Sequence, residues 1–217
     1  GNGNSKELDR VAVNVLRDSL NKIDFGGEVV TCEGKKDNSY EMDGEKVGRM
    51  WSDPTYDIAC DPIDGSTRTS KLQSDGTVLL VISNKNYIFK QTTYYMQKAV
   101  MRGDLYKYIG IESILNESIQ TLSENMITSL NRSPIVCMLD RERNYLFAKQ
   151  FREAGCRIKF IKDCDVMHSY GVFEGESDLY YGIGGGPECI LTASFVNSLG
   201  GRMEAQMVDH TKNWRID

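Results

Sequence analysis

The chain has 217 residues, of which 26% are charged, and its formal net charge at pH 7 is −5. This acidic balance argues against nucleic acid or an anionic membrane as the main partner, and apolar runs such as 78–82 are too short to cross a bilayer. Six scattered cysteines without a C-x-x-C pair favour a reducing, cytoplasmic location, and a count of only two histidines favours carboxylates as the ligands of any metal.

The first predicted element is a helix over residues 5–23, because apolar residues recur there with helical spacing and Asn4 can cap its start. Two glycines then break the pattern, and residues 29–32 predict a strand that brings Glu33 to its end. Residues 38–53 are polar and predict an exposed loop or hairpin. Residues 56–60 alternate like a short buried strand.

The most informative segment, the acidic turn, follows that strand with the sequence Asp61-Pro62-Ile63-Asp64-Gly65-Ser66-Thr67. Its proline predicts that the strand stops and that the chain turns at Asp61. Its glycine lets neighbouring N–H groups point at an anion, its aspartates are hard oxygen donors for Mg²⁺ or Mn²⁺, and its hydroxyls could orient a metal-activated water. From these residues alone, a simple turn capped by aspartate explains the segment equally well.

The rest of the chain predicts an antiparallel meander followed by alternating strands and helices. The meander comprises strands over 77–83, 87–91 and 93–102, and a helix over 111–130 follows it. Alternation then implies a parallel or mixed sheet covered by helices. The predicted strands are 135–139, 157–161, 178–183 and 202–208, and the predicted helices are 144–154, 166–173 and 188–199. The sequence therefore predicts a mixed α/β fold with an antiparallel-rich first half, residues 1–130, and an α/β second half, residues 131–217.

Acidic residues recur where predicted strands end, and functional residues of α/β proteins gather at such ends. Any one of them alone is more often a cap or a solvated turn, but the group together predicts a metal-bound phosphate site. Glu188 follows a Gly-Gly-Gly-Pro turn that permits close approach of a ligand, although a tight connection with a dipole-favoured glutamate accounts for it as well. The group consists of Glu33, Asp61, Asp64, Asp163, Asp165 and Glu188.

Several ordered motifs resemble one family over essentially the whole chain, the class II (GlpX-type) fructose-1,6-bisphosphatases of the lithium-sensitive, metal-dependent phosphomonoesterase superfamily. The motifs are Gly1-x-Gly3 with Asp9, Val30-Thr31-Cys32-Glu33-Gly34, Gly44-Glu45-Lys46-Val47-Gly48, Asp57-Ile58-Ala59-Cys60-Asp61-Pro62-Ile63-Asp64-Gly65-Ser66, Tyr95-Met96-x-Lys98, Asp163-x-Asp165-Val166 and Tyr181-Gly182-Ile183-Gly184-Gly185-x-Pro187-Glu188.

The resemblance implies a layered α-β-α-β-α sandwich, two ions of Mn²⁺ or Mg²⁺ and assembly into a homo-oligomer, either dimer or tetramer. It implies hydrolysis of the 1-phosphate of fructose 1,6-bisphosphate, with sedoheptulose 1,7-bisphosphate as an alternative substrate, in gluconeogenesis or sugar-phosphate metabolism. The family pattern begins with a helix before Gly1 and continues past Asp217, so the chain is expected to be incomplete at both termini.

The resemblance also assigns roles to individual residues. Asp9 and Glu33 would hold one ion and Asp61, Asp64 and Glu188 the second. Ser66 would orient the attacking water or, as the less favoured alternative, act as the nucleophile itself. The expected substrate contacts are Asp64, Gly65, Ser66, Tyr95, Arg141, Glu142, Arg143, Asp163, Cys164, Asp165 and Gly185.

Three of these assignments have simpler alternatives. Arg141 and Arg143 could grip the non-reacting phosphate, but a solvated charge cluster is the preferred interpretation from the residues alone. Tyr95 is as readily explained by packing within a strand. Asp37 is a candidate to accept the proton of the water, and a solvated loop acid explains it equally well.

The chain departs from the family pattern at a few positions. Lys35 stands where the family has an acid, so it either weakens metal binding or pairs with Asp37. Cys164 replaces a glycine, and Ser66 replaces the more usual threonine while keeping the hydroxyl. Two alternatives to the main hypothesis therefore stay open: a related sugar or inositol phosphatase with altered specificity, and a non-catalytic protein that binds sugar phosphates.

Overall fold

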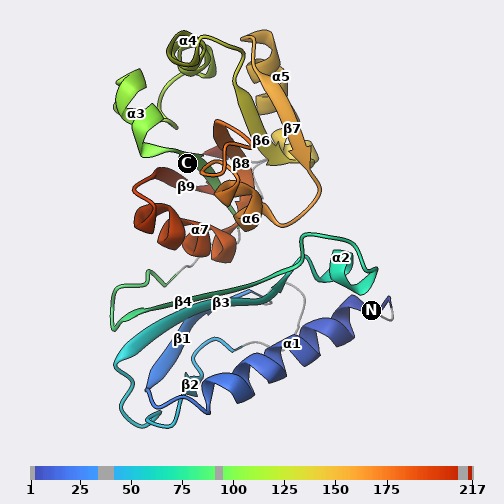
Figure 1. Ribbon diagram of the computed structural model, residues 1–217, viewed down its shortest axis with the longest axis vertical. Coiled ribbons are helices and arrows are strands. Elements are labelled where there is room, and N and C mark those ends of the chain that lie inside the picture. The colour runs from blue at the N-terminus through green and yellow to red at the C-terminus, as the bar shows by residue number, and fades with distance from the viewer. Residues whose placement is uncertain (1–2, 34–41, 91–94, 210–214, 217) are drawn as a thin grey trace. The chain divides into compact units, whose positions relative to one another are not determined.

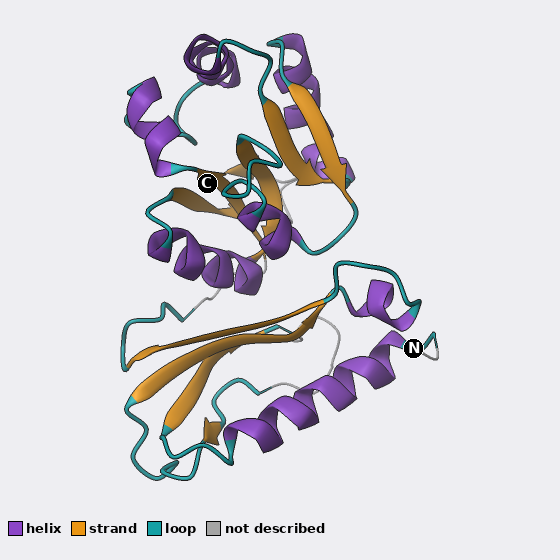
Figure 2. Cartoon of the chain, in the orientation of Figure 1, coloured by secondary structure: helices purple, strands orange, loops and turns teal. Residues whose placement is uncertain are grey.

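A computed structural model of the chain describes residues 3–33, 42–90, 95–209 and 215–216 (Figure 1). The chain divides into two compact units, Gly1–Tyr94 and Tyr95–Asp217, and each is described by itself. Each unit combines helices with a sheet that contains both parallel and antiparallel pairs, as Figure 2 shows. The predicted mixed α/β class is therefore confirmed.

The first unit is a four-stranded sheet with one long helix along one face (Figure 1). Helix α1 (Ser5–Leu20) begins where the sequence predicts, because the Asn4 side chain accepts a hydrogen bond from Glu7 N at 3.1 Å, but it ends before the predicted residue 23. Apolar residues of the helix pack with β1 and β3 in one core cluster. The strand order is β2-β1-β3-β4, with bounds β1 (Gly27–Cys32), β2 (Lys46–Val47), β3 (Tyr56–Asp64) and β4 (Thr77–Asn84).

Strand β3 continues past Pro62, so the predicted stop at Asp61 is wrong. Pairing with β4 runs regularly as far as Asp61 opposite Leu79, and its register then shifts before Asp64 pairs with Thr77. A proline, which lacks an N–H group, is tolerated within a sheet at such an irregularity. The strand consequently carries both aspartates of the acidic turn, and the chain turns only at Gly65.

The predicted meander is also wrong, because β4 and the next strand belong to different sheets. Residues 87–90, the described part of the predicted strand 87–91, form no strand, and the side chains of Tyr87 and Phe89 are 79% and 67% exposed. Asn86, with φ of +68°, lies in the turn after β4, and its N–H donates to Asp57 Oδ2 at 2.6 Å. The sequence predicted a strand here as part of the meander, but the described segment has no neighbouring strand to pair with.

The second unit is a six-stranded sheet covered by helices on both faces. Val136 and Met138 pack in the cluster that includes α3 (Gly103–Ile109), α4 (Ile119–Leu130) and α5 (Tyr145–Glu153), whereas Cys137 and Leu139 pack in the cluster that includes α7 (Gly186–Ser198). This period of two is typical of a strand buried on both sides. The strand order is β10-β9-β5-β8-β6-β7, with bounds β5 (Tyr95–Met101), β6 (Ile135–Leu139), β7 (Arg157–Ile161), β8 (Leu179–Gly185), β9 (Arg202–Asp209) and β10 (Arg215–Ile216).

The helices of the second unit differ from the prediction most over residues 103–118. The sequence predicted one helix over 111–130, but the structure has α3 (Gly103–Ile109), which was missed, and α4 (Ile119–Leu130). Ser118 defines the start of α4, because its side chain accepts from Thr121 N at 3.0 Å. The remaining elements are the short 3-10 helix η2 (Glu142–Asn144), α5 (Tyr145–Glu153), α6 (Asp165–Tyr170) and α7 (Gly186–Ser198).

The junction of β8 and α7 is more direct than predicted. Gly184 and Gly185 are the last residues of the strand, and Gly186 is the first of the helix, so the predicted turn over 184–187 is wrong. Pro187 lies in the first turn of α7, where its missing N–H group has no helical partner to lose. The strand therefore passes straight into the helix that carries Glu188. None of the described helices is long and apolar enough to span a membrane.

Candidate functional site

The acidic turn lies at the end of β3, beside the end of the parallel strand β1. Asp61 and Asp64 are buried, at 5% and 7% exposure, and Asp61 Oδ1 accepts from Ile63 N at 3.0 Å. The parallel pairing places Cys32 opposite Cys60, and the Glu33 N–H donates to the Cys60 carbonyl at 3.1 Å. Glu33 therefore follows one strand at the same edge where Asp61 lies on the other.

Gly65 takes the left-handed conformation, with φ of +81°, that turns the chain from β3 into the short helix α2 (Ser66–Ser70). Ser66 is half-buried at the start of that helix. Asp9 lies in the second turn of α1, and the hydrogen bond from Gly3 N to Ser70 O, at 3.1 Å, ties the chain just before α1 to the end of α2.

The five predicted metal ligands are divided between the two units. Four of them, Asp9, Glu33, Asp61 and Asp64, belong to the first unit and Glu188 to the second. Among the residues that the structure describes, no three His, Cys, Asp or Glu side chains form a group that could hold a metal ion. The chemistry of the set nevertheless fits hard divalent cations, because every donor is a carboxylate oxygen. The two-metal centre stays a prediction, and Asp37 and Lys35 lie outside the described residues.

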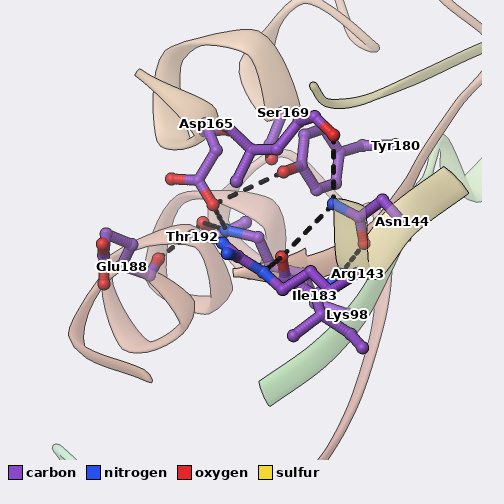
Figure 3. A network of polar contacts seen from close by, with 10 residues as sticks. Lys98, Arg143, Asn144, Asp165, Ser169, Tyr180, Ile183, Glu188 and Thr192 are labelled. Carbon is purple, nitrogen blue, oxygen red and sulfur yellow. Dashed lines mark hydrogen bonds and ion pairs between the residues drawn. The ribbon is translucent and has the colours of Figure 1, made fainter. Parts of the chain in front are cut away.

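In the second unit, Lys98 and Asp165 form a buried ion pair (Figure 3). Lys98 Nζ lies 2.9 Å from Asp165 Oδ2 and donates to Thr192 Oγ1 at 3.2 Å. The Tyr180 hydroxyl donates to the same aspartate oxygen at 3.4 Å, and Lys98 Nζ lies 5.2 Å from the centroid of the Tyr180 ring. Asp165, one of the predicted substrate contacts, is thus held by groups from β5 and β8.

The charges of this network shift two pKa values. Burial is the largest influence on the Lys98 ammonium and by itself would lower the pKa, but the charge and hydrogen bond of Asp165, together with the nearby Cys189 and Glu188, raise the pKa overall. Burial, reinforced by the charge of Asp165, raises the pKa of Tyr180 well above its ordinary value of 10.0. At neutral pH Lys98 is therefore a cation and Tyr180 is a neutral hydrogen-bond donor.

Two glycines at the end of β8 make room for two carboxylates. A Cβ atom on Gly184 would lie 2.5 Å from Asp165 Oδ2, and one on Gly185 would lie 2.0 Å from Glu188 Oε2. Both distances are too short for a real Cβ contact, so the acids occupy space that any other residue would fill. Gly185 and Glu188, both predicted site residues, are therefore in direct contact.

The predicted arginine segment divides into an exposed part and a part that faces the sheet. Arg143 Nε donates to the Ile183 carbonyl at 3.0 Å, and its guanidinium lies 5.2 Å from the centroid of the Tyr95 ring. Burial lowers the pKa of Arg143 from its ordinary value of 12.5. Arg141 and Glu142 are exposed, and Arg141 donates to the neighbouring carbonyl of Asp140. The structure thus joins Arg143 with Tyr95, and it leaves Arg141 as the solvated residue that charge patterning alone predicted.

The loop before α6 contains the remaining predicted residues. Cys164 is buried and takes the left-handed conformation, with φ of +59°, at the position where the family pattern has a glycine. Glycine adopts this conformation easily, whereas other residues are disfavoured in it. The backbone at Cys164 therefore follows the path that a glycine would take. Asp163 is half-buried, and Asp165 begins α6 one residue before the predicted start.

Sequence reasoning missed several residues of this network. The motif Tyr95-Met96-x-Lys98 by itself assigns no role to Lys98, and Thr192 and Tyr180 carry no signal of their own. Asn144 was assigned only to a helix, yet its side chain is fully buried and accepts from Ile183 N at 2.8 Å while donating to the Leu139 carbonyl at 3.1 Å. A lysine inside an apolar strand was the one available signal, since lysine is rarely buried without a partner.

Comparison with known proteins identifies the family. The family model for bacterial fructose-1,6-bisphosphatases encoded by glpX matches residues 1–216. The chain is 32% identical over 211 residues to the class 2 fructose-1,6-bisphosphatase of Haemophilus influenzae, covering 96% of this chain and 63% of that protein. It is 28% identical over 222 residues to the D-fructose 1,6-bisphosphatase class 2/sedoheptulose 1,7-bisphosphatase of Synechocystis, covering 96% of this chain and 64% of that protein. The chain spans less than two thirds of the length of these relatives. It belongs to the family of glpX-encoded bacterial fructose-1,6-bisphosphatases.

Proposed function

We propose that this chain forms part of a metal-dependent phosphomonoesterase that removes the 1-phosphate of fructose 1,6-bisphosphate. The observation that carries the proposal is the pair of buried carboxylates at the end of β3, Asp61 and Asp64, next to the strand that ends at Glu33. Carboxylate oxygens gathered at the ends of adjoining strands are the ligands that Mg²⁺ and Mn²⁺ prefer. Family membership and the names of the relatives support the substrate.

The cofactors of the proposed enzyme are two divalent ions, either Mn²⁺ or Mg²⁺. Asp9 and Glu33 would hold one ion, and Asp61, Asp64 and Glu188 the other. Bound ions of this kind neutralise the charge of a phosphate and lower the pKa of a coordinated water. An all-oxygen donor set suits these ions better than it suits Zn²⁺.

Two residues are proposed to act on the attacking water. Ser66 follows the buried Asp64 by two residues and is itself half-buried, so its hydroxyl can orient the water by a hydrogen bond. Asp37 would accept the proton as the water oxygen bonds to phosphorus and the bond from phosphorus to the sugar oxygen breaks, and the departing sugar oxygen would take a proton from solvent.

The substrate-binding proposal centres on the second unit. Arg143 would bind the non-reacting phosphate, because a guanidinium forms two parallel hydrogen bonds to such a group, and the stacked Tyr95 ring orients it. Asp165, held by Lys98, would accept a hydrogen bond from a sugar hydroxyl. Further contacts are proposed for Asp64, Gly65, Ser66, Arg141, Glu142, Asp163, Cys164 and Gly185.

Sedoheptulose 1,7-bisphosphate is proposed as a second substrate, because a relative is named for both activities.

We also propose that the protein is cytoplasmic and forms a homo-oligomer, either a dimer or a tetramer. All six cysteines lie in the described part of the chain and are buried free thiols, which agrees with a reducing compartment. Light scattering of the complete protein measures the oligomeric state, and a monomer would contradict that part of the proposal.

The decisive experiment measures phosphate release by the complete protein from fructose 1,6-bisphosphate, sedoheptulose 1,7-bisphosphate and an inositol monophosphate, each with Mn²⁺, Mg²⁺ or a chelator. We expect release from the bisphosphates with a divalent ion only. Activity that survives chelation would contradict the metal mechanism, and preference for the inositol monophosphate would contradict recognition of two phosphates. Binding without turnover would support the non-catalytic alternative.

A further inference from the structure

We propose that Lys98 is a positioning residue that holds two acids of the second unit in place, Asp165 through an ion pair and Glu188 through Thr192. The inference rests on the proposed function, because it takes Asp165 as a substrate contact and Glu188 as a metal ligand. It extends that function to a residue that touches neither the substrate nor the metal. Figure 3 shows Lys98, Asp165 and Glu188 around the β8–α7 junction.

The burial of Lys98 is unusual enough to require an explanation. Its side chain is 0% exposed, and an ammonium group removed from water is costly unless ion pairs and hydrogen bonds replace its hydration. The structure supplies such partners in Asp165 Oδ2 at 2.9 Å, Thr192 Oγ1 at 3.2 Å and the face of the Tyr180 ring. A lysine that only filled space would be replaced by an apolar residue at lower cost.

The ion pair fixes the orientation of Asp165. One carboxylate oxygen, Oδ2, forms the ion pair with Lys98 Nζ and accepts the hydrogen bond from the Tyr180 hydroxyl. The same oxygen lies against the backbone of Gly184. The other oxygen, Oδ1, is not used by these contacts and points away from them in Figure 3. Oδ1 is therefore available to accept a hydroxyl of the sugar, in a direction set by Lys98.

A second path leads from Lys98 to Glu188. The Thr192 hydroxyl receives a hydrogen bond from Lys98 and donates one to the Glu188 carbonyl at 2.7 Å. This chain ties the first turn of α7 to strand β5. The Glu188 carboxylate is confined on its other side by Gly185, where no Cβ atom could fit. Loss of the ammonium would loosen the backbone of Glu188 and release Asp165 at the same time.

The test uses two variants of the complete protein and one matched control. Lys98→Met keeps the length of the side chain and removes its charge. The double variant Lys98→Met with Asp165→Asn removes both buried charges, so no unpaired carboxylate remains to unfold the protein. The control is Arg132→Met, which breaks the ion pair to the buried Asp178, at 2.6 Å, just before the opposite end of β8.

The readouts are Mn²⁺ affinity, measured by electron paramagnetic resonance of the free ion, and KM and kcat for fructose 1,6-bisphosphate. We expect Lys98→Met to weaken Mn²⁺ binding about 10-fold and to raise KM by a similar factor, because outer partners of metal ligands have effects of this size. The double variant should regain the thermal midpoint of the wild type but keep the weakened Mn²⁺ affinity. Arg132→Met should lower the midpoint and leave Mn²⁺ affinity and KM unchanged.

The outcomes separate this inference from the proposed function. A folded Lys98→Met or double variant with wild-type Mn²⁺ affinity would overturn the positioning role, whatever the wild type hydrolyses. Wild-type protein that binds Mn²⁺ but hydrolyses no sugar bisphosphate would overturn the proposed function alone. Equal losses of Mn²⁺ affinity in the double variant and Arg132→Met would show a general loss of order in the unit and would also overturn the positioning role.

Discussion

The acidic turn of the first unit and the Lys98 network of the second present acids in two different ways. Asp61 and Asp64 are neighbours in sequence at the end of one strand, and Asp61 is oriented by a backbone N–H two residues away. Asp165 is held by Lys98, which lies 67 positions earlier in the chain on another element. Local chain geometry thus positions the first pair, whereas tertiary contacts position the second.

Because of this difference, substitutions in the two regions should have different effects on stability and on turnover. In the Lys98 network a cation offsets the charge of Asp165 inside the fold, so removing either partner should affect stability. In the acidic turn a carboxylate can be replaced by an amide of the same shape with its backbone hydrogen bond kept. Substitutions there should affect turnover far more than stability. Four predictions follow this contrast from the largest expected effect to the smallest.

Asp61→Asn should have the largest effect on turnover. The amide oxygen can still accept from Ile63 N, so the fold should persist, but the negative charge of a proposed metal ligand is lost. Because changes in outer partners of metal ligands already cost 10–100-fold, we expect kcat to fall by at least about 100-fold. Steady-state kinetics with Mn²⁺ in excess measures the loss, and unchanged turnover would refute the role of Asp61 as a ligand.

The matched control is Asp57→Asn, near the other end of the same strand. Asp57 is buried at 2% exposure, accepts from Asn86 N and lies 3.3 Å from Lys85 Nζ. Its loss should lower the thermal midpoint while kcat stays near the wild-type value. A similar fall in kcat in both variants would mean that β3 responds to any loss of buried charge, and the contrast between the two regions would disappear.

Gly185→Ala should have the next largest effect. The new methyl group would lie 2.0 Å from Glu188 Oε2, so the flexible end of the glutamate must move aside. Such movement costs little stability, but it displaces a proposed metal ligand, and we expect Mn²⁺ affinity to fall between about 10-fold and 100-fold. This variant separates Glu188 from the buried ion pair, which it leaves intact.

Gly110→Ala is the control for introducing a methyl group. Gly110 has φ of +65° and open space at its Cβ position, so alanine brings backbone strain of about 1 kcal/mol and no side-chain clash. Denaturant unfolding should detect that loss, and Mn²⁺ titration should detect none. Wild-type Mn²⁺ affinity in Gly185→Ala would show that the position of Glu188 does not matter to the metal.

Arg143→Lys should raise KM about 10-fold with little change in kcat, the effect of one lost charge-assisted hydrogen bond. Lysine keeps the charge but cannot donate to the Ile183 carbonyl and grip a phosphate with a planar fork at the same time. Arg152→Lys is the control, because Arg152 also lies over an aromatic ring, Phe160 at 5.3 Å, and has no proposed role. An equal KM for both variants would remove Arg143 from the substrate site.

Much of the fold was predictable, because burial on both faces leaves a clear pattern in short strands. Strands β6 and β7 have the predicted bounds, and the start of α1 follows from the Asn4 cap. Pairing between distant strands leaves no such local pattern. Strand β5 follows β4 in the sequence but pairs with β8 and β9, so the meander was wrong.

In the candidate site, too, features set by contiguous residues were predictable and features set by distant elements were not. The acidic turn was visible because its residues are contiguous, and only the effect of Pro62 on the strand was misjudged. Arg143 and Tyr95 were named from the resemblance, and the structure adds that they stack. Lys98 and Asn144 could not be found, because Lys98 acquires its partners only when β5 packs with α6, α7 and β8, and Asn144 only when η2 packs against β8. A polar residue inside an apolar pattern is a signal worth following, but it does not name its partner.

The smallest effect on activity is expected for Asp178→Asn, just before β8, at the other end of the strand from the β8–α7 junction. Burial alone would raise the pKa of Asp178, but its hydrogen bonds to Arg132 and to Ile135 N lower the pKa below its ordinary value of 3.8. The stability that Asp178 contributes is therefore fully present above about pH 3.8 and is lost as pH falls through the lower folded value. Urea unfolding between pH 3 and 6 should show a smaller loss of stability on acidification in Asp178→Asn than in the wild type, with unchanged kcat and KM at pH 7. Identical pH dependence in the two proteins would show that this ion pair adds no stability, and altered KM would show that the two ends of β8 are coupled.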